Sequence, residues 1–235
     1  MRHLRMLGLM LLAALALGAY AAAMASAEAG LLTLSGKSET IEVKGGEGKE
    51  PVFKAGSNEY RCTKLKALTT SATGAHVNLF KEVPLAFEGC KLAGEVSCRS
   101  ETLKAEKDPL GTILMLGDFH VVELESATKV LEAGLAVILL DPNTKEVGVV
   151  KIKCGTGNIE LKGTIKGVIS GASKNEDVAT GSFVFGGSNK CATTDTLCKT
   201  LEASPFLINL SGTYEPVTLT VTVPFTTNIM ALVDY

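Results

Sequence analysis

Alternation of apolar and polar side chains recurs along this chain and most constrains its fold. In the segment 217–223, four aliphatic residues alternate with three threonines. The same pattern recurs at 150–154, 159–166, 183–185 and 206–210. Because successive side chains of a strand point to opposite faces, this pattern predicts strands with one buried face. The run 135–140 is continuously apolar instead, which predicts a strand buried on both faces.

Turn-forming residues separate these segments. Asp141-Pro142-Asn143-Thr144 and Gly155-Thr156-Gly157 each predict a tight connection, as do the segments 171–177 and 211–213. The glycine-rich segment 44–49 predicts a flexible loop. Short strands joined by such turns predict an all-β fold, namely an antiparallel β-sandwich or barrel with hairpin connections.

One stretch, 122–133, leaves its secondary structure open. Its apolar residues have mixed spacing, which fits either a helix or a strand, a turn and a second strand. We favour the two strands because the flanking segments alternate.

The first 27 residues have the three parts of a secretory signal peptide. They begin with a basic start containing Arg2 and Arg5, continue with the uncharged apolar stretch 6–24, and end with Ala25-Ser26-Ala27. An uncleaved membrane anchor is the alternative, disfavoured because the stretch is rich in Ala and Gly and the small-residue site follows at once. We therefore expect a cleaved signal-peptide helix at 1–27 and no membrane span after cleavage. Residues 28–235 would form one secreted or envelope-associated all-β domain.

The charge of the chain argues against a nucleic-acid partner. The formal net charge is −2, and removal of Arg2 and Arg5 with the signal peptide would make it −4. The lysines are spread singly along the sequence, whereas a nucleic-acid surface needs a concentrated basic face. We expect an unknown extracellular or envelope ligand as the partner.

Six cysteines follow the signal peptide: Cys62, Cys90, Cys98, Cys154, Cys191 and Cys198. An even number in an exported chain predicts disulfides, although spacing alone leaves the pairing open. Proximity favours Cys90–Cys98 across a predicted hairpin turn and Cys191–Cys198 across a short loop, which leaves Cys62 for Cys154. A zinc site is disfavoured because no C-x2-C or C-x4-C pair occurs.

Several short motifs follow one another in a recognisable order. They are Phe87-Glu88-Gly89-Cys90, Gly94-Glu95-Val96-Ser97-Cys98, Gly111-Thr112-Ile113, Leu116-Gly117-Asp118-Phe119-His120, Lys151-Ile152-Lys153-Cys154-Gly155 and Gly163-Thr164-Ile165-Lys166-Gly167-Val168-Ile169. Over residues 55–185 this order resembles a group of secreted, paralogous, uncharacterised β-rich bacterial proteins of soil actinobacteria. The resemblance implies a framework of four cysteines, with the pair near residue 195 an addition. It implies no catalytic residue.

Candidate catalytic residues are few. His76 and His120 are the histidines after the signal peptide, and His120 has carboxylates near it in sequence, as a general base would need. We expect His120 instead to be a strand residue hydrogen-bonded to a neighbour. Ser126-Ala127-Thr128-Lys129 and Ser173-Lys174-Asn175 match two motifs of penicillin-recognising serine enzymes, but the third motif is missing. The sequence thus predicts no catalytic, cofactor or metal site.

These observations favour an exported, non-catalytic binding or structural protein. On β scaffolds the loops commonly bind ligands, and the candidate loops here are 186–200 and 44–51. Two alternatives remain open: a barrel that encloses a small apolar ligand, and an exported hydrolase that uses His120.

Overall fold

The computed structural model describes most of the chain after the predicted signal peptide. The described residues are 32–36, 40–67, 70–73, 76–92, 96–101, 111–125, 131–170, 178–186, 190–210 and 212–234. The signal peptide at 1–27, the turn at 171–177 and the serine motifs beginning at Ser126 and Ser173 lie outside these residues.

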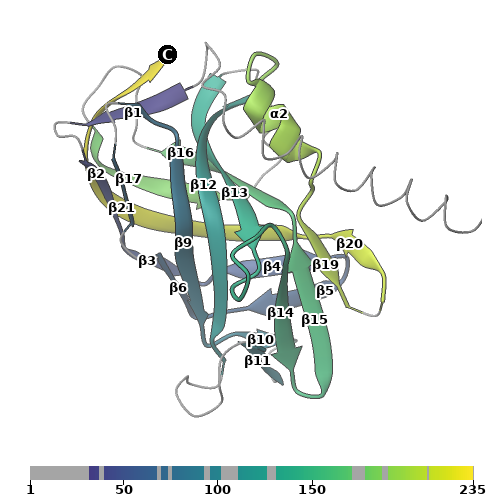
Figure 1. The fold of residues 1–235 in the computed structure, drawn as a ribbon. Coiled ribbons are helices and arrows are strands. Elements are labelled where there is room, and N and C mark those ends of the chain that lie inside the picture. Colours follow the sequence, from purple (N-terminus) through teal and green to yellow (C-terminus); the bar gives the residue numbers. More distant parts are fainter. Residues whose placement is uncertain are drawn as a thin grey trace, which may run out of the picture.

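The protein is nearly all β, as predicted, and its strands form one large antiparallel sheet that curls like a barrel (Figure 1). Six neighbouring strands make most of the wall: β9 (Leu79–Glu88), β12 (Ile113–Glu125), β13 (Leu131–Leu140), β16 (Thr164–Ser170), β17 (Val178–Phe185) and β21 (Thr218–Asp234). The strands β9 and β12 run steeply across the direction of β17 and β21 (Figure 1). The strands on either side of residues 126–130 confirm the β interpretation of 122–125 and 131–133.

Shorter strands near the N-terminus continue this wall. They are β1 (Leu32–Gly36), β2 (Thr40–Gly45), β3 (Glu47–Lys49), β6 (Lys64–Ala67), β7 (Thr70–Thr73) and β8 (His76–Val77). β2 pairs with β21, β3 pairs with β6, and β6 pairs with β9. Only one residue separates β2 from β3. The path from β21 through β2, β3 and β6 therefore returns to β9, the strand at the other end of the six-stranded wall.

A further set of strands continues from the first residues of β21. They pair in the order β4 (Val52–Ala55), β5 (Asn58–Arg61), β10 (Lys91–Leu92), β11 (Val96–Ser100), β14 (Val149–Cys154), β15 (Gly157–Lys162), β19 (Leu207–Asn209) and β20 (Tyr214–Pro216). The predicted turns at 141–144 and 155–157 lie before and after β14. Both turn predictions are confirmed.

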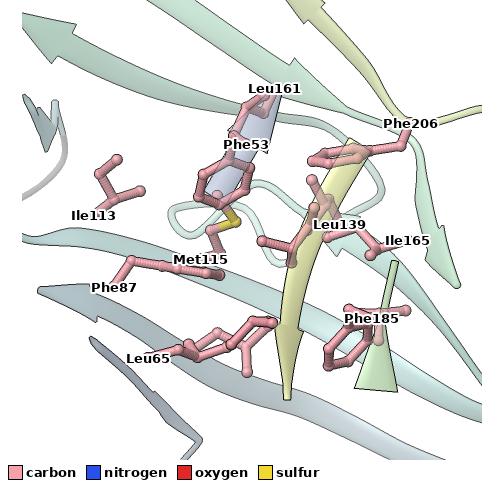
Figure 2. Close-up of a cluster of buried hydrophobic side chains, with 14 of the residues drawn as sticks. Phe53, Leu65, Phe87, Ile113, Met115, Leu139, Leu161, Ile165, Phe185 and Phe206 are labelled. Atoms are coloured by element: carbon pink, nitrogen blue, oxygen red, sulfur yellow. The ribbon is translucent and has the colours of Figure 1, made fainter. Parts of the chain in front are cut away.

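Side chains from facing parts of the curled sheet meet in its interior, as Figure 2 shows. Phe53 from β4 lies with its ring centroid 4.9 Å from that of Phe87 on β9. The alternating segment 217–223 buries its four aliphatic residues and exposes threonines 218, 220 and 222, as predicted. The run 135–140 is buried throughout, which confirms a strand covered on both faces.

The prediction of a flexible loop at 44–49 is wrong, because this segment forms the end of β2 and all of β3. Gly46 and Gly48 allow this segment to pack closely against β21. The Gly46 amide donates to the Pro224 carbonyl over 2.7 Å, and a Cβ atom on Gly48 would lie 2.8 Å from a methyl carbon of Val221. Glycine is therefore needed here because a side chain would collide with the neighbouring strand.

The cysteine pairing was predicted correctly for one bond of three. Cys191–Cys198 is present, but the other bonds are Cys62–Cys90 and Cys98–Cys154. The predicted Cys90–Cys98 and Cys62–Cys154 bonds are therefore wrong.

Strand register explains the observed pairing. Cys98 is directly opposite Cys154 on β11 and β14, and Cys90 lies one position from the Lys91–Arg61 pair, which places it beside Cys62. The Cys98 amide also donates to the Cys90 carbonyl over 2.9 Å. Cys62, Cys90, Cys98 and Cys154 thus form a row across four adjacent strands, here called the cysteine row. In this row Cys62 is bonded to Cys90, and Cys98 is bonded to Cys154.

The predicted loop 186–200 contains two elements, β18 (Lys190–Cys191) and the helix α2 (Thr196–Glu202). Asp195 caps the helix, since its carboxylate accepts the Cys198 amide over 2.7 Å. Cys198 and Leu201 pack against the outer face of β12 and β13, where they form a second, small core with Val122, Leu124, Ala136, Ile138 and Cys191. We call β18, α2 and the Cys191–Cys198 bond the α2 module. Within the described residues, no helix has the length and apolar character needed to cross a membrane.

Candidate binding groove

The curled wall opens where β17 ends. β17 pairs with β16 only from Gly167 onward and with β21 only from Val221 onward. The preceding residues, 164–166 on β16 and 218–220 on β21, therefore have no described strand between them. This gap forms a groove with a volume of about 330 Å³.

Two further chain segments border the groove. Gly186, directly after β17, lies at one end, and the segment 204–206 lies at the other. The Thr164 amide donates to the Ser204 carbonyl over 2.8 Å, and the Val217 amide donates to the Phe206 carbonyl over 3.1 Å. The connection from α2 to β19 is thus hydrogen-bonded to both sides of the gap, which fixes the width of the groove at this end.

The floor of the groove is apolar and belongs to the main core. Phe206, Val217 and Leu219 line it, and their exposed fractions are only 8%, 5% and 4%. Figure 2 places Phe206 among the interior side chains. A molecule seated in the groove would therefore extend the main core outward and bury apolar surface.

The rim is polar and contains one ion pair. Lys166 of β16 pairs with Glu202, the last residue of α2. The Lys166 side chain is 22% exposed and the Glu202 side chain 40%. Thr164, two residues before Lys166, also lines the groove, and its buried hydroxyl has no hydrogen-bond partner in the structure. These three polar side chains could orient a ligand.

His120, the residue that the sequence singled out for general-base chemistry, lies elsewhere. It is on β12, it is only 2% exposed, and its Nε2 atom has no hydrogen-bond partner in the structure. Burial away from water lowers the pKa of His120 to about 4, so the ring is neutral at neutral pH. A ring enclosed in this way does not contact solvent, where a substrate would have to reach it. For His76, the described structure gives only its backbone place in β8.

Asp118, the carboxylate nearest His120 in sequence, has a structural partner. Its Oδ1 atom accepts the backbone amide of Glu82 over 2.8 Å, at a bulge where Glu82 has a φ of 53°. Burial raises the pKa of Asp118, and the hydrogen bond from the Glu82 amide opposes that rise. Asp118 therefore holds the bulge of β9 against β12.

The sequence indicated part of the groove and missed the rest. The predicted binding loop 186–200 supplies Gly186, and α2 continues from it to Leu201 and Glu202. The other predicted binding loop, 44–51, supplies no lining residue. The alternation at 159–166 places Lys166 only on the polar face of a strand. Its distinguishing signal is the contact with Glu202, which depends on tertiary structure.

Comparison with protein families, with curated proteins and with solved structures finds no match. Among the described residues, no cluster of three or more His, Cys, Asp or Glu side chains could hold a metal ion. The groove is therefore the feature of the described structure that indicates a function.

Proposed function

We propose that this chain is an exported, non-catalytic binding protein of the cell envelope or extracellular space, and that its ligand binds in the groove between β16, β21 and α2. The observation that supports binding is the opening of the wall onto apolar core side chains. A volume of about 330 Å³ is in the range of small-molecule sites, which are mostly apolar with a few placed polar groups. The signal-peptide features of the sequence support export, and the three disulfides are typical of oxidising compartments.

A ligand enclosed in the interior has less support. Between Phe53, Tyr60, Ile113 and the β15 side chains, the interior leaves a void of about 10 Å³. That volume is about the minimum for a single water molecule. In this part of the interior, the space that a barrel would give to a ligand is filled by side chains.

A hydrolase has less support for another reason. The His120 ring is enclosed on the outer face of β12, and its neighbour Asp118 is engaged with the Glu82 amide. A general base needs access to the proton that it removes. The groove, by contrast, is open to solvent, and its polar lining residues are Thr164, Lys166, Glu202, Ser204 and Thr218, with no histidine among them.

Titration with n-octanol, an uncharged amphiphile, followed by amide chemical shifts tests the proposal. We expect saturable shifts at groove residues such as Leu219 and Lys166. Thr218→Trp, which places a large ring on an exposed lining residue, should abolish them. Thr222→Trp is the matched control, because Thr222 is exposed on the same face of β21 and is not a lining residue. Shifts that are absent, or that persist unchanged in Thr218→Trp, would overturn the proposal.

A further inference from the structure

We infer that the ligand of the groove is a compact amphiphilic carboxylate, whose carboxylate takes the place of Glu202 on Lys166. This inference rests on the proposed binding function and adds the chemical class of the ligand. It follows from the unequal solvent exposure of Lys166 and Glu202 at the rim, from the shape of the groove and from its apolar floor.

Lys166 is the fixed member of the ion pair. It lies within β16, a strand paired with β13 on one side, where Lys166 is opposite Ala136. Its side chain is the more enclosed of the two, at 22% exposed, and it lines the groove. Removing the anion next to an enclosed ammonium leaves a charge that is only partly hydrated, which is unfavourable. Lys166 therefore requires an anionic partner whether or not a ligand is bound.

Glu202 is the replaceable member. It is the last residue of the seven-residue helix α2, and its side chain is 40% exposed. Its carboxylate can rotate into water, where hydration compensates for the lost partner. A ligand carboxylate that binds Lys166 would then exchange one charge-assisted hydrogen bond for another at little cost. A cationic ligand would instead have to displace the more enclosed ammonium.

Thr164 is a second candidate donor, although its hydroxyl is buried at the edge of the groove and a ligand would have to displace neighbouring atoms to reach it. It lies on the same face of β16 as Lys166, two residues earlier, and its hydroxyl has no partner in the structure. Buried hydroxyl groups normally have partners, so an unpartnered one beside a groove is a candidate ligand contact. The hydroxyl can donate to a carboxylate oxygen or accept from an ammonium, so the preference for an anion comes from the unequal exposure of Lys166 and Glu202.

The size and closure of the groove limit the rest of the ligand. At roughly 30 Å³ for each water-sized group, the space fits on the order of ten non-hydrogen atoms. The segment 204–206 bridges both sides of the gap at one end, which disfavours an extended peptide running through it. The floor of Phe206, Val217 and Leu219 would contact a short alkyl or aromatic body. A carboxylate of roughly the size of octanoate meets these limits.

Calorimetric or NMR titrations with n-octanoate, n-octanol and n-octylammonium at neutral pH test the inference, because all three are unbranched eight-carbon molecules that differ in the charge of the head group. Because the ligand carboxylate must displace Glu202, we expect octanoate to bind only a few-fold more tightly than octanol, less than the roughly tenfold or greater value of a hydrogen bond to a charged group. Octylammonium should bind no better than octanol. Thr218→Trp should abolish all three titrations.

Two substitutions at the rim sharpen the test. Glu202→Gln removes the competing carboxylate, so the affinity for octanoate relative to octanol should rise several-fold. Lys166→Met keeps the alkyl stem and removes the charge, so octanoate should fall to the affinity of octanol in the same variant. The ratio of the two affinities is the readout because both residues line the groove, and amide spectra that match the wild type away from the rim show that each variant is folded.

The outcomes separate this inference from the proposal beneath it. If octanol and octanoate bind equally, or if Glu202→Gln weakens octanoate, the carboxylate inference fails while the binding function stands. If octylammonium binds best, the replaceable member is Lys166 and the inference is reversed. If none of the three gives a saturable titration that Thr218→Trp abolishes, both the inference and the proposed groove fail.

Discussion

The cysteine row and the α2 module both contain disulfides, yet they stabilise the protein in different ways. The row joins four adjacent strands through bonds between residues 28 and 56 positions apart in sequence. The bond of the α2 module spans seven positions and holds one short helix on the outer face of the sheet. The row therefore constrains long segments of the chain, whereas the module is a local attachment.

Removing Cys98–Cys154, the disulfide with the larger sequence separation in the cysteine row, should lower the stability most. For Cys98→Ala with Cys154→Ala, the chain-entropy relation gives a loss of about 4 kcal/mol in the free energy of unfolding, because that bond closes a long loop in the unfolded chain. Urea unfolding of the oxidised proteins measures it. Cys191→Ala with Cys198→Ala is the comparator, and an equal loss in both would contradict the distinction.

Loss of the Asp195 carboxylate should come next, at about 3 kcal/mol, since it leaves two backbone amide donors without a partner. Its two oxygens accept the Cys198 amide over 2.7 Å and the Glu123 amide over 2.8 Å, and Asp195 is 2% exposed. Asp195→Ala measured by urea unfolding gives the value. Asp195→Asn keeps one acceptor oxygen and should lose less. A loss below about 1 kcal/mol for Asp195→Ala would show that water or another acceptor replaces the carboxylate.

Removal of the Cys191–Cys198 bond should lower the free energy of unfolding by about 2.5 kcal/mol. The effect should be local, so faster amide hydrogen exchange is expected at 190–202 and unchanged exchange in β14 and β15. Because Leu201 and Glu202 line the groove, octanol binding should weaken as well. Faster exchange throughout the sheet would instead show that the module supports the whole fold.

An effect of similar size, seen only at acid pH, concerns the outer face of β12, which carries His120 beside the module contacts Val122 and Leu124. Burial lowers the pKa of His120 from 6.5 to about 4 in the folded protein. The unfolded chain therefore takes up a proton first, and the folded protein loses stability as the pH falls from about 6.5 to about 4. Above pH 6.5 this loss is absent.

His120→Leu removes that titration. Between pH 7.5 and pH 4.5 the variant should lose roughly 2.5 kcal/mol less than the wild type. Urea unfolding at the two pH values measures the difference. The pKa of Asp118 is raised in both proteins, so its contribution cancels in the comparison. Equal pH dependence in variant and wild type would mean that His120 is hydrated in the folded state.

Local patterns predicted the strands, two of the hairpin turns and the bond of the α2 module, because each depends on residues close in sequence. The alternation at 217–223 determined a face, and Cys191 and Cys198 lie seven positions apart. The cysteine row could not be predicted this way. Cys90 has Cys62 on one side and Cys98 on the other, so only the register of four strands and the side-chain geometry determine which bond forms.

The groove and α2 were harder to predict from the sequence because they also depend on contacts between residues that are distant in sequence. α2 is too short for an apolar repeat to show, and its capping Asp195 also bonds to a strand 72 residues away. The groove brings together β16, β21 and the connection 204–206, none of which has an unusual sequence. Glycines 46 and 48 misled the prediction because close approach to another strand and loop flexibility favour the same residue.

The position of β21 has a consequence for the rate of folding. β21 pairs with β1, β2, β4 and β17, so Leu32 lies opposite Asp234 and Phe53 opposite Leu219. Such pairs bring together the most distant parts of the sequence, and folds dominated by them form slowly. The strand pairing around the wall is complete only when β21 has paired with the N-terminal strands. We therefore expect slow refolding, limited by the pairing of β21 with the N-terminal strands.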